Sequence, residues 1–253
     1  MHPHRRLDCA NGFSRQTRCD HGGDHRREII HRGVAIAHEQ KADVGIRGGD
    51  RWQRHTCTRG CAGAAAPTAT APNKVTTRHY VVGSGNGLAN VFVYLKDAKA
   101  APAAGEAAVL DQKGCMYDPY VMGVVTGQKF KIKNSDATLH NVHATPKINK
   151  EFNFGQPLKD QVSEKSFDQA EVLVRMKCDV HPWMFAYVGV VDHPYFAVTD
   201  KDGNFKISGV PDGKYTVVAY HLKTHGANPG VTQAVEVKGA AKQDFTVEIA
   251  AAP

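Results

Sequence analysis

The sequence predicts an all-β protein built from β-sandwiches. Beyond about residue 75, the chain consists of short segments in which apolar and polar residues alternate, and turn-forming residues separate these segments. This part shows no long stretch with the helical repeat of apolar residues. Short strands at close spacing, without long amphipathic helices, are typical of a β-sandwich. At 253 residues, the chain is long enough to bury one or two cores.

Three segments predict strands on which the rest of the fold depends. Residues 89–95 alternate and are rich in β-branched and aromatic side chains. Residues 128–133 place apolar side chains on one face and basic side chains on the other. A third strand leads directly to Cys178, and one of its faces carries Val172, Val174 and Met176.

Turn signals divide the C-terminal part into further strands. Asp202-Gly203 lies between two β-prone segments and predicts a β-hairpin. Pro211-Asp212-Gly213 predicts the next turn. Strands are expected around and after these turns, at residues 196–199, 204–207, 215–220, 233–237 and 244–249.

Residues 1–62 carry most of the net charge and show no helical or strand repeat. They hold twelve Lys and Arg against seven Asp and Glu, whereas the remaining chain holds 20 against 18. We expect residues 1–62 to be disordered or to come from a misassigned start, with a linker at residues 63–74. The nearly neutral remainder offers no basic stripe, so nucleic-acid binding is not expected.

The sequence contains no apolar run that could span a bilayer, and no apolar core of a signal peptide near its start. Residues 60–72 resemble the mature start of a bacterial lipoprotein, which would place a lipid anchor on Cys61. Beyond this segment only Cys115 and Cys178 remain. Cys115 is expected to be a buried free thiol.

The strongest functional signal is a segment with three metal-ligating side chains, Cys178, His181 and Met184, spaced C-x2-H-x2-M. Two His, one Cys and a weak axial Met form a blue-copper site, since soft sulfur ligands prefer copper to hard cations. The second imidazole must come from elsewhere, and His140 or His143 can supply it. Residues three apart on a strand point to opposite faces, so both cannot reach one ion, and we favour His140.

Other interpretations of these side chains are simpler. Cys178 and Met184 could merely fill the core, but the combination of four candidate ligands in the expected order argues against this. A second metal site at His193, His221 and His225 has no supporting spacing, and these are expected to be solvated or turn residues.

Three segments resemble the opening half of a cupredoxin, at residues 117–120, 126–134 and 140–143. The loop that begins at Cys178 is similar to the short ligand loop of amicyanin, in the plastocyanin and amicyanin group. The resemblance covers roughly residues 108–192 and implies a Greek-key β-sandwich. It also implies one type 1 copper ion, with equatorial ligands His140, Cys178 and His181 and axial ligand Met184. Asn141 would then tie the two ligand segments together by hydrogen bonds.

The resemblance implies an electron carrier that shuttles single electrons. In the family, the C-terminal His is the electron port, here His181 framed by Pro182 and Trp183. An unidentified redox partner protein would dock there weakly. A blue-copper site requires an oxidising compartment, so we expect the periplasm or the cell surface. The alternative is a cell-surface binding module that stores or delivers copper, or is structural. An enzyme is not expected, because the loop shows no open coordination position and no general base.

The chain from Tyr195 onward resembles a carboxypeptidase regulatory-like (transthyretin-like) β-sandwich, on residues 200–205 and 209–217. Such modules begin with a Leu-x-x-Val-x-Val strand, and this pattern occurs far upstream, at residues 88–93. We therefore expect a discontinuous domain. Residues 75–104 and 193–253 would form a smaller, immunoglobulin-like or transthyretin-like sandwich, with the cupredoxin domain at residues 105–192 inserted into it.

Overall fold

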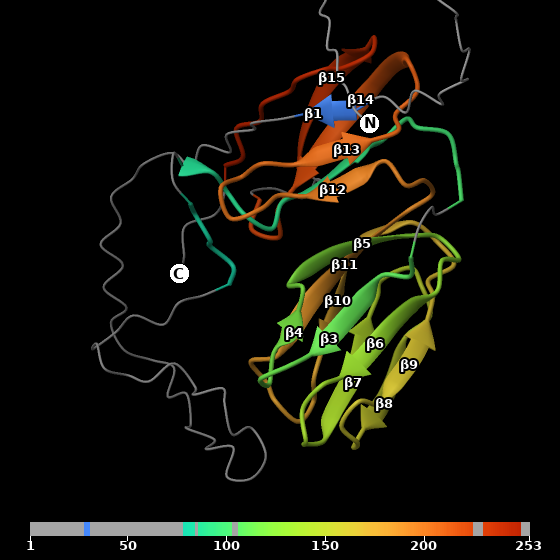
Figure 1. The fold of residues 1–253 in the computed structure, drawn as a ribbon, viewed down its shortest axis with the longest axis vertical. Helices are drawn as coiled ribbons and strands as arrows, with labels where there is room; N and C mark the ends of the chain where they lie inside the picture. Colours follow the sequence, from blue (N-terminus) through green and yellow to red (C-terminus); the bar gives the residue numbers. More distant parts are fainter. Residues whose placement is uncertain (1–27, 31–77, 84–85, 103–105, 225–229, 249–253) are drawn as a thin grey trace, which may run out of the picture.

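The computed structural model describes residues 28–30, 78–83, 86–102, 106–224 and 230–248 (Figure 1). These residues form strands and turns with no α-helix, so the all-β prediction is confirmed. None of them forms a helix with the length and apolar character needed to cross a bilayer. The predicted linker at residues 63–74, Cys61 and His225 lie outside the described residues, as does the segment 1–62 apart from 28–30.

Strands β3 to β11 form two sheets that face each other, here called the first sandwich (Figure 1). One sheet has the order β5-β11-β10-β7-β8, with strands Val121–Val125, Phe185–Val191, Glu171–Lys177, His140–Thr145 and Phe152–Gln156. The other has the order β4-β3-β6-β9, with strands Tyr117–Asp118, Val109–Gln112, Phe130–Asn134 and Val162–Lys165. The pairs β5–β11 and β3–β6 are parallel, and the other pairs are antiparallel.

Alternation along the strands builds the core between these sheets. On β6, Phe130 and Ile132 are fully buried while Lys131 is exposed, as the sequence predicts. They belong to the same apolar cluster as Val142 of β7 and Met176 of β10, in the facing sheet. Burying side chains of this size stabilises the fold by roughly 1.5–3 kcal/mol each.

A β-bulge in β10 changes one predicted face. The register of β10 against β11 shifts between Glu171 and Val174, and Leu173 has a φ of 59°. The bulge turns the strand, so that Val174 and Met176 face the core while Val172 packs against a different apolar cluster. The prediction that Val172 shares their face is therefore wrong.

A second unit contains a sheet with the order β12-β2-β14-β15. Its strands are Phe196–Val198, Phe92–Leu95, Gly213–Tyr220 and Val231–Val237. Strand β2 pairs with β12 on one side and β14 on the other, so chain from before the first sandwich joins chain from after it. This unit has its own apolar core. Such a pairing is what a discontinuous domain requires.

Strand β1 (Glu28–Ile30) pairs antiparallel with β13 (Lys206–Ser208). The sequence predicts no strand in the segment that contains β1, because that segment shows no apolar alternation.

Asp202-Gly203 makes a turn but not the predicted hairpin. Gly203 has a φ of 80°, and its N–H donates to Asp200 O at 3.1 Å. The Asp200 carboxylate accepts the N–H groups of Asp202 and Asn204, each at 2.9 Å. The flanking strands β12 and β13 pair with β2 and β1, not with each other. Residues 244–248, expected as a strand, alternate in burial but join no sheet.

Two glycines allow the second unit to pack on the first sandwich. A Cβ on Gly189 of β11 would lie 2.4 Å from the ring of Phe92, and one on Gly123 of β5 would lie 2.2 Å from the ring of Phe196. The two rings are 5.7 Å apart and belong to the apolar cluster around buried Tyr120. The two parts of the protein therefore share an apolar contact.

Candidate metal centre

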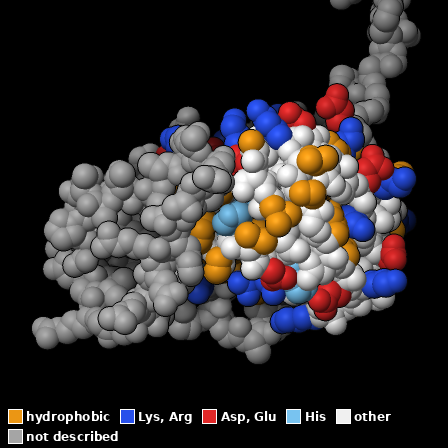
Figure 2. Space-filling view, turned by 90° about the horizontal axis from the view of Figure 1, so that it is seen from below, with side chains coloured by type: hydrophobic (Ala, Val, Ile, Leu, Met, Phe, Trp, Pro, Cys, Tyr) orange, Lys and Arg blue, Asp and Glu red, His pale blue; other side chains and the backbone are white. Residues whose placement is uncertain are grey.

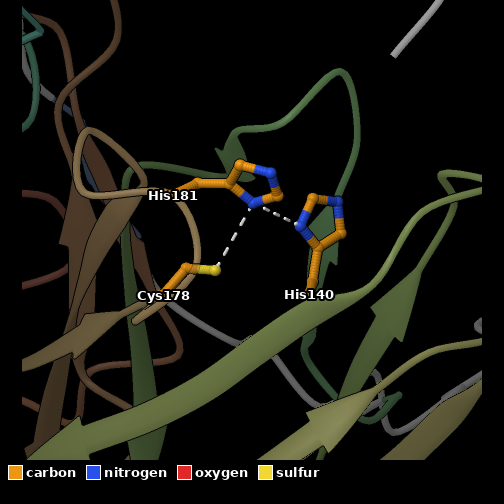
Figure 3. A group of neighbouring side chains, drawn as sticks. All are labelled: His140, Cys178 and His181. Carbon is orange, nitrogen blue, oxygen red and sulfur yellow. Dashed lines mark hydrogen bonds between the residues drawn. The ribbon is translucent and has the colours of Figure 1, made fainter. Parts of the chain in front are cut away.

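Three side chains converge in the first sandwich (Figure 3). His140 is the first residue of β7, and Cys178 and His181 lie in the loop between β10 and β11. The Nδ1 atoms of His140 and His181 are 3.1 Å apart, and Cys178 Sγ lies 3.6 Å from His181 Nδ1. All three ligand atoms lie within 4.8 Å of one another, and all three residues are buried.

These separations fit one metal ion. Bonds of about 2.0 Å to imidazole nitrogen and 2.3 Å to thiolate sulfur place ligand atoms roughly 3.3–3.8 Å apart around the ion. Imidazole with thiolate is a donor set for copper or zinc and not for Mg²⁺ or Ca²⁺. The group of His140, Cys178 and His181 can therefore hold a soft metal ion.

Backbone hydrogen bonds close the loop that carries the motif. Cys178 N donates to Met184 O at 3.0 Å, and Met184 N donates to His181 O at 2.9 Å. Met184 is fully buried and belongs to the same apolar cluster as Cys178. The C-x2-H-x2-M spacing thus becomes a tight loop in which all three motif residues are buried.

Asn141 connects β7 with this loop. Its backbone N–H donates to Cys178 Sγ at 3.4 Å, and its Oδ1 accepts the N–H of Asp179 at 3.1 Å. Fully buried Tyr117 reinforces the connection, since its hydroxyl donates to Asn141 O at 2.8 Å. The cupredoxin resemblance implies that Asn141 ties these two segments together by hydrogen bonds, whereas the contribution of Tyr117 was not anticipated.

Asp136 is a residue of the site that sequence reasoning missed. Its Oδ2 accepts a hydrogen bond from Nε2 of His140 at 2.8 Å. Hydrogen bonds from backbone N–H groups and from His140 keep the pKa of Asp136 below its usual range, although burial alone would raise it. Its position four residues before a candidate ligand, in a loop, is the only sequence signal that could have identified it.

His143 lies on the opposite face of β7 from His140. Its Nδ1 is 2.8 Å from Asp179 Oδ2, and its Nε2 is 2.5 Å from Glu151 Oε1. Asn153 Nδ2 also donates to Asp179, at 3.1 Å. Both ring nitrogens of His143 therefore face carboxylates, outside the group of three ligands.

Electrostatics in the site favour a thiolate. Burial alone would raise the pKa of Cys178, but hydrogen bonds with His140 and with backbone N–H groups, including that of Asn141, bring it below its ordinary value. Burial would likewise lower the pKa of His140, but its hydrogen bonds with Cys178 and Asp136 raise it. Burial, aided by the charge of His140, lowers the pKa of His181. The lowered pKa values of Cys178 and His181 favour the thiolate and the neutral imidazole that bind metal, whereas the raised pKa of His140 favours its protonated form.

Apolar side chains surround the site at the surface. Leu139, Val180 and Trp183, from the two ligand-bearing segments, are 45%, 48% and 37% exposed, whereas His181 is only 6% exposed. Figure 2, which views the molecule from below, shows hydrophobic side chains gathered across this face beside a histidine, with charged side chains around them.

Cys115 is not the free thiol expected from the sequence. It is disulfide-bonded, and Cys178 is the free cysteine among the described residues. A second group of potential ligands, Cys115, Asp136 and His140, shares His140 with the first, and its sulfur is already bonded. His193 and His221 were expected to be solvated or turn residues; both are buried, and His221 lies in a turn in which its O accepts the Thr224 N–H at 2.9 Å. His193 Nε2 bonds Leu95 O at 2.7 Å, and His221 Nδ1 accepts the Lys223 N–H at 3.3 Å.

Comparison with solved structures finds likenesses that cover part of the chain. A variant of amicyanin in the Cu(I) form is 23% identical, with a TM-score of 0.30, and the match covers 39% of this chain and 97% of that one. A purple cupredoxin from Nitrosopumilus maritimus is 20% identical, with a TM-score of 0.28, covering 33% and 98%. A copper-containing nitrite reductase from Thermus scotoductus SA-01 is 17% identical, with a TM-score of 0.30, covering 37% of this chain and 24% of that one. No protein-family model and no curated protein matches the chain.

Proposed function

We propose that the protein is a type 1 copper electron carrier, with equatorial ligands His140, Cys178 and His181 and axial ligand Met184. The observation that carries this proposal is the convergence of two imidazole nitrogens and one thiolate sulfur within 4.8 Å, all buried. The axial role of Met184 rests on its place in the motif and on its burial with Cys178. A bound copper ion would supply reversible one-electron chemistry.

The protein's own residues contribute rigidity and exclusion of water. Efficient electron transfer requires that the ligands move little when the charge of the metal changes, so they must be held on a stiff scaffold. Strand pairing holds His140 on β7, and two backbone hydrogen bonds hold the loop from Cys178 to Met184. Asn141 bridges these two segments. Burial of all four proposed ligands would keep bulk water away from a bound metal ion.

We further propose that electrons pass through the surface over His181, Pro182 and Trp183. Exposed Val180 and Trp183, together with Leu139, make this surface apolar, which suits a weak contact with a redox partner protein. An oxidising compartment, periplasmic or at the cell surface, would supply copper and partners. We expect no enzymatic turnover by the protein itself.

The second unit is proposed to be a carboxypeptidase regulatory-like sandwich made from residues 75–104 and 193–253, with the copper domain at residues 105–192 inserted into it. The pairing of β2 with β12 and β14 supports this division. Its role would be structural or adhesive.

The visible absorption spectrum after addition of Cu(II) tests the proposed function. We expect an intense blue thiolate-to-copper band in the wild-type protein, absent from Cys178→Ser, because this band requires a Cu–S bond. Reversible reduction and reoxidation should accompany it. A colourless protein that binds copper weakly and releases Cu(I) readily to a chelator would contradict the electron-carrier proposal and favour a storage or delivery module.

A further inference from the structure

A two-residue turn lies beside the metal centre. Gly114 and Cys115 join β3 to β4 with φ values of 62° and 54°. Across the turn, Lys113 N donates to Met116 O at 2.9 Å, and Met116 N donates to Lys113 O at 3.2 Å. Positive φ at both central residues is characteristic of a type I′ turn. The N–H groups of Gly114 and Cys115 therefore take no part in the hairpin ladder.

These two N–H groups bind the carboxylate of Asp136. Gly114 N donates to Asp136 Oδ1, and Cys115 N donates to Asp136 Oδ2, each at 2.8 Å. Consecutive N–H groups that point to one side of a turn form a small anion-binding concavity. The carboxylate is thus fixed by the backbone, independently of His140.

The fixed carboxylate determines which nitrogen of neutral His140 carries the proton. Asp136 Oδ2 lies 2.8 Å from His140 Nε2. An ionised carboxylate can only accept hydrogen bonds, so Nε2 must be the donor. The lone pair of Nδ1 then faces His181 Nδ1, 3.1 Å away, on the side of the ring where Cys178 lies (Figure 3).

The same turn also holds the ligand loop. Trp183 Nε1 donates to Cys115 O at 3.1 Å, and the Trp183 ring is centred 5.3 Å from the His181 ring. The backbone of Cys115 is therefore linked to both candidate His ligands. Its N–H reaches His140 through Asp136, and its C=O reaches His181 through Trp183.

We propose that Asp136 is a positioning residue of the metal centre: held by the Gly114–Cys115 turn, it fixes the orientation and the tautomer of His140. This inference rests on the proposed copper function. A carboxylate on the outer nitrogen of a metal-binding His orients the ring and raises its affinity for the metal.

The first test uses the metal-free protein. Long-range ¹H–¹⁵N NMR correlations report which ring nitrogen of His140 carries the proton, at a pH high enough to make this ring neutral, which lies above the ordinary histidine range because its pKa is raised. We expect the Nε2–H tautomer in the wild-type protein. In Asp136→Asn, the carboxamide can direct its NH₂ group at Nε2, and we expect the Nδ1–H form to become populated. A wild-type protein with His140 in the Nδ1–H form, or a variant with an unchanged tautomer, would overturn the proposal.

The second test compares Cu(I) affinity, by competition with a chelator, in the wild-type protein and in two variants. We expect Asp136→Asn to bind copper about 10–100-fold more weakly, the usual cost of losing such a partner. Glu171→Gln is the matched control, because Glu171 also binds backbone N–H groups, those of Lys147, Ile148 and Asn149, but contacts none of the proposed ligands. This control should bind copper like the wild-type protein.

The outcomes separate this inference from the proposed function. Equal Cu(I) affinity in Asp136→Asn and the wild-type protein would overturn the positioning role. A wild-type protein that binds no copper would instead overturn the copper proposal, while the NMR result would still decide the role of Asp136 toward His140. If Asp136→Asn does not fold, the wild-type tautomer alone decides the proposal.

Discussion

At the scale of single residues, the environment of His221, outside the candidate metal centre, opposes its protonation. It follows β14 directly and is fully buried. Burial, together with the positive charges of His79 and Lys223, lowers the pKa of His221 from 6.5 to about 4. The neutral ring is therefore part of the folded structure, and protonation must oppose folding.

His221→Gln should remove a pH dependence of stability. The unfolded chain binds a proton near pH 6.5 and the folded protein only near pH 4, so the wild-type protein loses stability as the pH falls through this window. The loss attributable to His221 should approach about 3 kcal/mol at pH 4, at 1.36 kcal/mol per pKa unit. Denaturant unfolding at a series of pH values measures it. Parallel curves for the variant and the wild-type protein would contradict this account.

The sequence predicts His140 as a candidate ligand, but it does not reveal the role of Asp136 or the bonding of Cys115. Strand periodicity separates His140 from His143, and the structure places them on opposite faces of β7. The role of Asp136 depends on a turn more than twenty residues earlier in the chain, and a single carboxylate in a loop carries no signal of such a partner. The free thiol predicted at Cys115 is wrong because a disulfide depends on distances that the sequence does not contain.

At the scale of secondary-structure elements, the start of β10 anchors a neighbouring loop. The Glu171 carboxylate accepts N–H groups from Lys147, Ile148 and Asn149 at 2.5, 3.1 and 3.1 Å. These hydrogen bonds lower the pKa of Glu171, although burial alone would raise it. The loop between β7 and β8 belongs to no strand, and ionised Glu171 accepts the backbone N–H groups that would otherwise be paired in a sheet.

Glu171→Gln should destabilise the protein at neutral pH by about 1.5–3 kcal/mol, the usual contribution of hydrogen bonds to a charged group. Because the folded-state pKa of Glu171 is depressed, its contribution is present above the unfolded-state pKa and is lost as the pH falls through the folded-state value. The difference between the wild-type protein and the variant should therefore shrink on acidification. Chemical unfolding at neutral and acidic pH measures this difference, and one that grows at low pH would refute the explanation.

Element prediction succeeded where alternation was regular. Residues 128–133 alternate without interruption, and β6 has the predicted faces. On β10, the bulge at Leu173 inserts a residue that periodicity cannot reveal, so the face of Val172 was predicted wrongly. At Asp202-Gly203 the turn formed, but its flanking strands found other partners. Local sequence specifies the turn, whereas tertiary packing selects the pairing.

At the scale of the whole molecule, the contact between the two units depends on the absence of two side chains. Phe92 and Phe196 lie against Gly189 and Gly123, in the space that a Cβ atom would occupy. The sequence gives no hint that these glycines, inside apolar strand segments, receive rings from another part of the chain.

Gly189→Ala should destabilise the protein by about 1–3 kcal/mol, the usual cost of overpacking, because the added methyl group collides with the ring of Phe92. Adding Phe92→Leu should recover part of this loss, since the two positions are in contact. Gly155→Ala is the matched control, because its Cβ would meet only Leu139 Cδ1, at 3.6 Å. Thermal unfolding of five proteins measures these effects: the wild type, the single variants Gly189→Ala, Phe92→Leu and Gly155→Ala, and the double variant. Additive losses in the double variant would argue against a direct collision.

The position of β2 between β12 and β14 has a consequence for biosynthesis. Strand β2 ends at residue 95 and β14 begins at residue 213. At about 5–20 residues per second, a ribosome needs roughly 6–24 s to make the chain between them. Strands β3 to β11 are contiguous in sequence and can assemble during this interval. Strand β2 cannot pair with β12 and β14 until these strands have been synthesised. Strand β2 therefore lacks its partners while the first sandwich is being made, and the second unit can be completed only late in synthesis.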